Sequence, residues 1–207
     1  MGKRAMALLA GVIPAVGVIA LMGWALARSG GTPGGLGIYK VFGEVAIEPG
    51  PAPPFSLELL TGEAVKLEDL RGKVVLVDFW SSWCPPCVEE APTLAQVYRE
   101  YSGRGVEFLG IAIWDDEDVV RRHVARFRVP YLNAIDGQGT VAIDYGVRGI
   151  PEKFFLDREG KLVKKFVGPA PAEKLRAILD ELLGGLGTAR AEGGLSPAAA
   201  TPGQPGR

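Results

Sequence analysis

Hydrophobic and polar positions change period several times between residues 55 and 183, and each period predicts one kind of element. Residues 73–80 and 106–114 are almost continuously apolar, which is typical of strands that are covered on both faces. Apolar and polar residues alternate on both sides of the turn at 61–62, and this alternation predicts a β-hairpin. A second hairpin is predicted where two apolar segments flank the turn sequence DREG at 157–160.

Apolar residues at helical spacing lie between these predicted strands and after them. One segment begins at the cysteines and is stopped by Gly103, a second, 115–129, opens with acidic capping residues, and a third, 171–183, begins with a proline. The apolar faces consist of Cys87, Ala91, Leu94, Tyr98 and Tyr101 in the first segment and Val119, Val120, Val124 and Phe127 in the second. This order of elements predicts an α/β fold with a central mixed sheet, mostly parallel with an antiparallel edge, flanked by helices.

The N-terminal segment has the pattern of a transmembrane helix. Residues 6–27 form a stretch of 22 residues without a charge, and a helix of that length covers about the 30 Å of a bilayer's hydrocarbon core. Lys3 and Arg4 precede it, which favours a cytoplasmic N-terminus. The alternative is a cleaved signal peptide, because residues 25–27 resemble a cleavage site, although the apolar region of a signal usually has only about 7–15 residues. Both interpretations place the rest of the chain on the extracytoplasmic side of the cytoplasmic membrane.

Composition changes at both ends of the domain and divides the chain into four parts. Residues 29–54 contain seven glycines and five prolines, which is typical of a linker, although the apolar segment 38–47 within it has the composition of a short strand. Residues 184–207 are mostly Gly, Ala and Pro and are predicted to form a disordered tail. The predicted organisation is a cytoplasmic tip and membrane anchor at 1–28, the linker, one domain at 55–183 and the tail.

Charge and cysteine content narrow the chemistry. The formal net charge is −1, so nothing indicates a nucleic-acid partner. Cys84 and Cys87 are the only cysteines, too few for a scaffold stapled by disulfides. A structural zinc site needs more ligands than one cysteine pair provides. The single histidine, His123, lies among arginines and is predicted to be a solvated surface residue.

The cysteine pair lies at a predicted junction between a strand and a helix. Cys84 falls where the helix begins and Cys87 one turn further on. Backbone N–H groups and the positive end of the helix dipole favour a thiolate at the first position. We expect Cys84 to be exposed and Cys87 to be shielded on the apolar stripe, an asymmetry that a two-step disulfide exchange requires. A purely structural disulfide across so short a loop would contribute little stability, so redox chemistry is the preferred interpretation.

Two separate motifs resemble one known family. The segment VDFWSSWCPPC at 77–87 resembles the active-site segment of thioredoxins. The longer GKVVLVDFWSSWCPPCVEEAPTL resembles the membrane-anchored branch that serves cytochrome c maturation (TlpA, ResA and CcmG-like proteins), and residues 145–162 resemble the second signature of that branch. The resemblance covers about residues 53–183 and implies a thioredoxin-like fold. It also implies that Pro92 kinks the first helix and that Pro151 follows a cis peptide bond opposite the cysteines.

Three acidic residues are candidates for the site. Asp78 matches the buried aspartate of classical thioredoxins, and Glu90, on the helix face of Cys87, matches a glutamate near the active site of the anchored branch. Either acid has the chemistry to accept the proton of Cys87. The alternatives are a strand-end carboxylate for Asp78 and a partner of the helix dipole for Glu90. Glu152 follows Pro151 as in the maturation branch, and its alternative is an exposed loop acid.

These features predict a membrane-tethered thiol–disulfide oxidoreductase whose only redox group is the Cys84–Cys87 disulfide, without a bound cofactor or metal. The resemblance implies that the substrate is a disulfide of apocytochrome c and that a transmembrane electron-donor protein re-reduces the pair. A general disulfide oxidant or a thiol reductant for copper sites would use the same chemistry. The alternative from another class is a tethered metal-binding or interaction module.

Overall fold

The computed structural model describes residues 2, 16–24 and 42–188, which belong to two units divided after Lys40. In the first unit residues 16–24 are helical, and the rest of the expected transmembrane stretch at 6–27 lies outside the described residues. None of the helices in the described part of the chain is long and apolar enough to cross a membrane.

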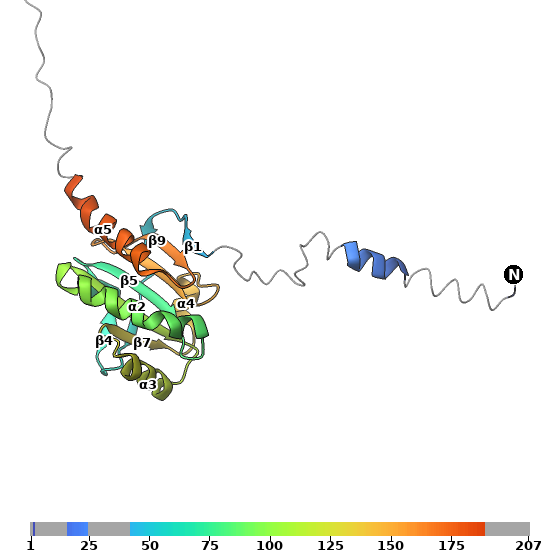
Figure 1. Ribbon diagram of the computed structural model, residues 1–207, viewed down its shortest axis with the longest axis horizontal. Helices are drawn as coiled ribbons and strands as arrows, with labels where there is room; N and C mark the ends of the chain where they lie inside the picture. Colours follow the sequence, from blue (N-terminus) through green and yellow to red (C-terminus); the bar gives the residue numbers. More distant parts are fainter. Residues whose placement is uncertain (1, 3–15, 25–41, 189–207) are drawn as a thin grey trace, which may run out of the picture. The chain divides into compact units, whose positions relative to one another are not determined.

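A seven-stranded mixed sheet forms the centre of the second unit (Figure 1). Its strand order is β1-β9-β8-β5-β6-β7, and β2 also pairs with β9. The parallel pairs are confined to β5, β6 and β7, because β8 runs antiparallel to β5 and β9 antiparallel to β8. The mixed sheet is therefore confirmed, but its antiparallel part is larger than the edge that the sequence predicts. The strands of this sheet are β1 (Gly43–Val45), β2 (Gly50–Pro51), β5 (Val74–Trp80), β6 (Val106–Ile113), β7 (Leu132–Asp136), β8 (Glu152–Leu156) and β9 (Lys161–Val167).

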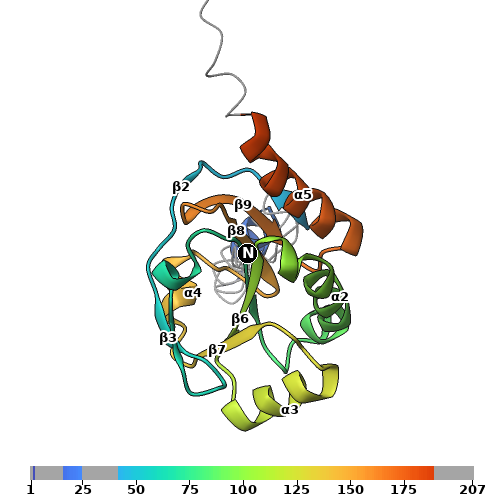
Figure 2. The ribbon, with the colours of Figure 1, turned by 90° about the vertical axis from the view of Figure 1, so that its left-hand side faces the viewer.

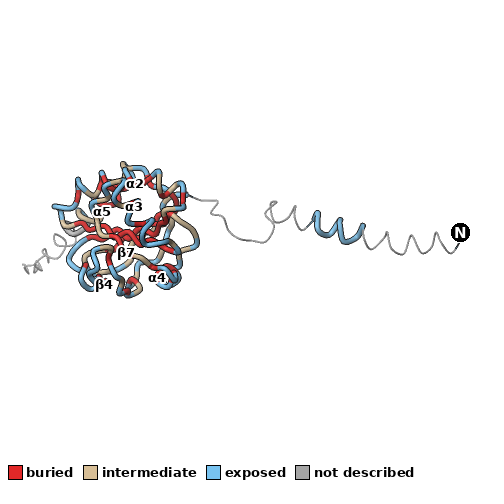
Figure 3. Tube along the Cα trace, turned by 90° about the horizontal axis from the view of Figure 1, so that it is seen from below, coloured by how far each residue is buried: buried red, intermediate tan, exposed pale blue. Residues whose placement is uncertain are grey.

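Helices cover both faces of this sheet. On one face lie α2 (Pro85–Tyr101) and α5 (Ala172–Thr188), with α3 (Glu117–Phe127) beside α2 (Figure 2). The other face is covered by α4 (Thr140–Asp144), the 3₁₀ helix Leu67–Leu70 and a hairpin. That hairpin, β3 (Ser56–Glu58) with β4 (Ala64–Lys66), surrounds the turn that the sequence predicts. Buried residues form a band between the elements that cover the two faces of the sheet (Figure 3).

Two hydrophobic cores explain the continuous apolar run of β5. Val75, Val77 and Phe79 face the core under α4 and the hairpin, whereas Val74 and Leu76 face the core under α2 and α5. Every residue of β5 and of β6 is buried, as expected for strands that are covered on both faces.

Part of the segment 29–54 forms strands, although its composition predicts a linker. β1 and β2 lie within it and pair with β9. These pairs cover the backbone of β9 at a sheet edge that would otherwise be open. At the other end of the domain, α5 continues to Thr188, beyond the expected start of the tail. Residues 189–207 lie outside the described part of the chain.

The sequence pattern does not predict β7 and α4, because polar residues interrupt the apolar run of that segment. Asn133 and Asp136 are nevertheless buried. Asp136 accepts hydrogen bonds from the backbone N–H groups of Thr140 and Ala142 at 2.9 and 3.0 Å. Its carboxylate therefore satisfies N–H groups in the first turn of α4, which have no partner within the helix.

Candidate active site

Cys84 caps the N-terminus of α2, directly after the turn that follows β5. Its backbone is extended, with φ −91° and ψ 106°, and its Sγ accepts a hydrogen bond from the N–H of Cys87 at 3.3 Å. Pro85 and Pro86 occupy the first helical turn, where their missing N–H groups remove no intrahelical bond. Cys84 and Cys87 form a disulfide with a Cα–Cα distance of 5.3 Å. The predicted placement of the pair at a helix start is confirmed.

The expected difference in exposure between the two cysteines is wrong for this oxidised state. Cys84 is 4% exposed and Cys87 5%. Both belong to one buried cluster with Trp80, Ala112 and Val120 on neighbouring elements. The difference between the two thiols therefore lies in their positions on the helix, because Cys84 alone receives the N–H of the first turn.

The peptide bond between Ile150 and Pro151 is cis, as the resemblance implies. The carbonyl oxygen of Ile150 lies 3.8 Å from Sγ of Cys84. Pro92, the other proline of the resemblance, lies inside α2. The loop before β8 and the start of α2 thus meet at the sulfur of Cys84.

Asp78 and Glu90 are both buried, and one lysine joins them. Nζ of Lys153 contacts the carboxylate of Glu90 at 2.5 Å and lies 3.5 Å from Oδ1 of Asp78. The other oxygen of Glu90 accepts the N–H of Ala170 at 2.7 Å. The sequence predicts that one acid or the other lies beside the cysteines. In the structure, both acids and Lys153 form one charged group, with one residue each from β5, α2 and β8.

Burial changes the acidity of both carboxyl groups. Desolvation raises the pKa of Asp78, and Lys153 opposes the rise. Desolvation likewise raises the pKa of Glu90 to about 7, with a smaller contribution of the same sign from the charge of Asp78 and opposition from Lys153. A carboxyl group that titrates near neutral pH, as Glu90 does, is suited to proton transfer under physiological conditions.

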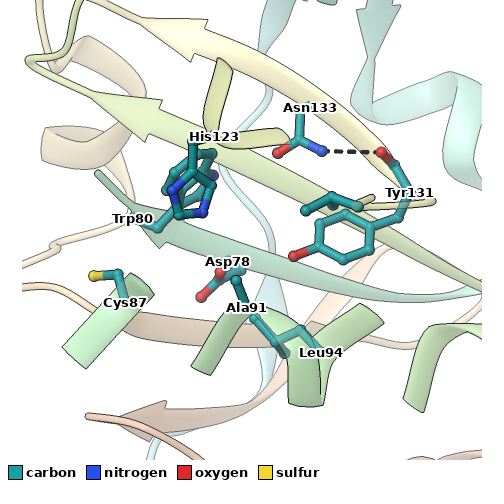
Figure 4. Close-up of a pocket in the computed structure, with 9 residues that line it drawn as sticks. Asp78, Trp80, Cys87, Ala91, Leu94, His123, Tyr131 and Asn133 are labelled. Carbon is teal, nitrogen blue, oxygen red and sulfur yellow. Dashed lines mark hydrogen bonds between the residues drawn. The ribbon is translucent and has the colours of Figure 1, made fainter. Parts of the chain in front are cut away.

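Asp78 and Cys87 both line a small cavity of about 10 Å³ (Figure 4). This volume is at the lower limit for one water molecule. His123 lines the same cavity and is 8% exposed, so its expected place on the solvated surface is wrong. Its ring lies 4.6 Å from the ring centre of Trp80, and burial lowers the pKa of its imidazole. The cavity is completed by Ala91, Leu94, Val129, Tyr131 and Asn133.

Glu152 is a fully buried residue of β8 and not an exposed loop acid. It pairs with Nζ of Lys165 at 2.7 Å and accepts the backbone N–H of Arg148 at 3.2 Å. These contacts hold the loop that leads to Pro151. Glu152 therefore contributes to the site by holding this loop. The cluster of Asp78, Glu90 and Lys153 contributes from another side, because Glu90 lies on α2, the helix that carries Cys87.

Two exposed tryptophans border a groove beside Cys84. Trp83 and Trp114 are 56% and 55% exposed, and the indole N–H of Trp83 donates to the carbonyl of Trp114 at 3.2 Å. We call this hollow of about 300 Å³ the aromatic groove. Its lining consists of Trp83, Ile113, Trp114, Val147, Arg148, Gly149 and Ile150. The backbone of Trp114 has a φ of 49°, rare for a residue with a side chain.

Sequence reasoning missed Lys153, Trp114 and the lining role of His123. In the sequence, Lys153 appears only as a charged residue beside the apolar residues of the segment EKFFL in β8. The alternation of a strand alone indicates that such a charged residue faces solvent. In the described part of the chain, no group of three or more His, Cys, Asp or Glu side chains is arranged to hold a metal ion.

Comparisons with known proteins agree with this geometry. The family model described as Redoxin matches residues 49–183. The chain is 33% identical over 131 residues to a thiol-disulfide oxidoreductase ResA of Bacillus cereus, covering 63% of this chain and 76% of that protein. It is 36% identical over 126 residues to ResA of Halalkalibacterium halodurans, covering 61% and 72%. A solved thiol:disulfide interchange protein of the thioredoxin family from Chlorobium tepidum TLS is similar with a TM-score of 0.60 at 30% identity, covering 68% of this chain and 100% of that one.

Proposed function

Because the chain belongs to the Redoxin family, among its ResA-like thiol–disulfide oxidoreductases, we propose that it is a membrane-tethered reductant of protein disulfides outside the cytoplasm. The observation that carries the proposal is the Cys84–Cys87 disulfide at the N-terminus of α2, with the carbonyl of Ile150 beside Sγ of Cys84. This arrangement gives one sulfur the stabilisation of a helix N-terminus and keeps its partner within reach.

The proposed reaction has two exchange steps. The thiolate of reduced Cys84 attacks one sulfur of the substrate disulfide, forms a mixed disulfide and releases one substrate thiolate. The thiolate of Cys87 then attacks the sulfur of Cys84, re-forms the Cys84–Cys87 disulfide and releases the second substrate thiolate. Two electrons pass from the cysteine pair to the substrate, and a dithiol donor must return them.

The second step requires that Cys87 lose a proton inside a buried cluster, where desolvation disfavours a thiolate. Asp78 borders the cavity that Cys87 lines, and Glu90 is joined to Asp78 through Lys153. We therefore assign Asp78 and Glu90 to proton transfer and Cys84 and Cys87 to sulfur exchange. Glu152 and Pro151 hold the loop against which the substrate would lie.

The aromatic groove supports a protein substrate. It is mainly apolar, lies beside Cys84, and presents two exposed indole rings that can pack on a peptide segment. The proposed substrate is apocytochrome c, whose haem-attachment cysteines form a closely spaced pair. A transmembrane dithiol protein is the proposed electron donor, and the apolar segment at 6–27 is the proposed anchor.

Trapping of the mixed disulfide tests this function. The full chain carrying Cys87→Ser cannot complete the second step, so it should accumulate covalent complexes that a reducing agent dissolves. The matched control, Cys84→Ser with Cys87→Ser, should accumulate none. Recovery of apocytochrome c as the captured protein supports the proposed substrate. Capture of a different class of protein would replace it, and no capture by the single variant would contradict the reaction itself.

A further inference from the structure

Lys153 is a fully buried lysine, 0% exposed, at the second position of β8. Its ammonium group contacts the carboxylate of Glu90, lies 3.5 Å from Asp78 and donates to the carbonyl of Gly168 at 3.2 Å. A charge is costly to bury unless it is paired and hydrogen-bonded. These contacts both pair and hydrogen-bond the ammonium group. Asp78, Glu90 and Lys153 therefore form a defined cluster of buried charges in the site.

The charges in this cluster do not balance when both acids are ionised. One ammonium then faces two carboxylates, which leaves a net charge of −1 in a buried place. A single proton on either acid makes the cluster neutral. Like charges and burial both favour uptake of that proton, whereas Lys153 opposes it. The three residues therefore act as a unit that takes up and releases one proton.

Contacts distinguish the two acids within the unit. Both oxygens of Glu90 are held, one by the N–H of Ala170 and one by Lys153. Asp78 holds Lys153 only at the longer distance and borders the cavity that Cys87 lines. Glu90 is thus fixed as the anchor of Lys153, and Asp78 is the acid of the cluster that lines the same cavity as Cys87.

Other titratable groups packed around the cluster leave this charge balance unchanged. Burial and the two acids raise the pKa of Tyr131 well above its usual value, so its phenol stays neutral. Burial lowers the pKa of His123, so its imidazole is neutral at neutral pH. Glu152 and Lys165 form their own pair in the structure. Within the described part of the chain, Lys153 is the cation that forms ion pairs with both Asp78 and Glu90.

We propose that Lys153 is a positioning residue that joins Asp78 and Glu90 into one acid–base unit, through which Asp78 takes the proton of Cys87. The ionised cluster accepts this proton and becomes neutral. The thiolate of Cys87 attacks Cys84, the bond between Cys84 and the substrate breaks, and its electron pair leaves with the substrate thiolate. The cluster then gives its proton to that thiolate. This inference rests on the proposed function.

The test is the rate of the second exchange step against pH in the full chain, with a model disulfide peptide. In Lys153→Met the carboxyl pKa values should rise, since a cation is lost. Because the pKa of the unit starts at about 7, a rise of about one unit would lower its ionised fraction and slow the step about fivefold at pH 7, and the rate should recover at higher pH. Lys73→Met, which breaks the Lys73–Glu107 pair at the other end of β5, should leave the pH midpoint unchanged. An unchanged midpoint in Lys153→Met would overturn the inference.

A second measurement needs no variant. Carboxyl-carbon NMR of the unmodified oxidised chain should show that Asp78 and Glu90 exchange a single proton near pH 7 while the second carboxyl remains ionised. Ionisation of both groups well below neutral pH, or protonation of both well above it, would overturn the shared proton. If the unmodified chain does not exchange with the peptide at all, the proposed function fails. If it exchanges but lacks these titrations, only the role of Lys153 fails.

Discussion

Glu152 and Lys153 are neighbours in β8, yet their side chains enter opposite layers of the domain. Lys153 lies opposite Asp78 in the sheet and reaches Glu90 on α2, whereas Glu152 lies opposite Phe79 and pairs with Lys165. The alternation of a strand thus sends one charged residue to the proton-transfer cluster and the next to the loop before Pro151. For this reason, two consecutive residues of the sequence make contacts in two different parts of the site.

Cys84 should be the faster-reacting thiol. Although both cysteines are buried in the oxidised state, Cys84 caps the helix, where backbone N–H groups stabilise a thiolate. Alkylation of the reduced chain near neutral pH, followed by mass spectrometry, should label Cys84 well before Cys87. Equal rates, or faster labelling of Cys87, would contradict the order of the two steps.

Removal of both acids should impair the reaction more than removal of either one. Glu90→Gln alone should slow disulfide reduction modestly, because Asp78 still borders the cavity of Cys87. Asp78→Asn alone should slow it more, because both oxygens of the remaining Glu90 are already held by Ala170 and Lys153. The double variant should slow it by roughly 10²–10⁴-fold, the range for loss of general-base catalysis. The rate of reduction against pH measures this, with the alkylation rate of Cys84 as a control for its thiolate. A double variant with an unchanged rate at neutral pH would exclude both acids as the base.

Stability should fall as pH rises toward neutrality. The pKa of Glu90 is raised from 4.5 to about 7 in the folded chain, so the folded state binds this proton more tightly than the unfolded state. The resulting stabilisation is complete below about pH 4.5 and is lost as pH rises through about 7, by roughly 3 kcal/mol at most. Denaturant unfolding of the oxidised chain at several pH values should show this slope. Glu90→Gln should remove it, and Glu89→Gln, at an exposed position of the same helix, should keep it.

Gly139 should matter for protein substrates through Trp114. A Cβ at Gly139 would lie 2.5 Å from the indole nitrogen of Trp114, and the φ of Gly139 is 73°. Gly139→Ala should displace Trp114 from the aromatic groove and raise KM for a protein disulfide several-fold, with little change for a small-molecule disulfide. Gly146→Ala is the matched control, because its φ is 64° but no atom lies within 4 Å. Both variants should lose about 1–2 kcal/mol of stability from backbone strain. An equal effect of the two on KM would contradict the role of Trp114.

The apolar segment at 6–27 should keep the chain in the membrane fraction. Burial of this much apolar surface is insensitive to ionic screening, so a high-salt wash should not release the protein. Recovery of a soluble protein that begins near Arg28 would instead show that the segment is a cleaved signal peptide.

Local sequence was sufficient to predict β5, β6, the two hairpins, the start of α2 and the place of Cys84, because each depends on residues close together in the chain. Lys153 could not be placed in this way. It is 75 positions from Asp78 and 63 from Glu90, and its burial depends on strand register and on the packing of α2. His123 was misplaced for a related reason, because its charged neighbours indicate solvent whereas its ring packs on Trp80.

The reduction potential of the Cys84–Cys87 pair tests the central claim most directly. We expect equilibration of the full chain with glutathione or dithiothreitol buffers, followed by quantification of free thiols, to give a value well below about −200 mV, in the range of reductants. A value near about −120 mV, as in strong oxidants, would contradict the proposed reduction of protein disulfides and assign the pair to disulfide formation.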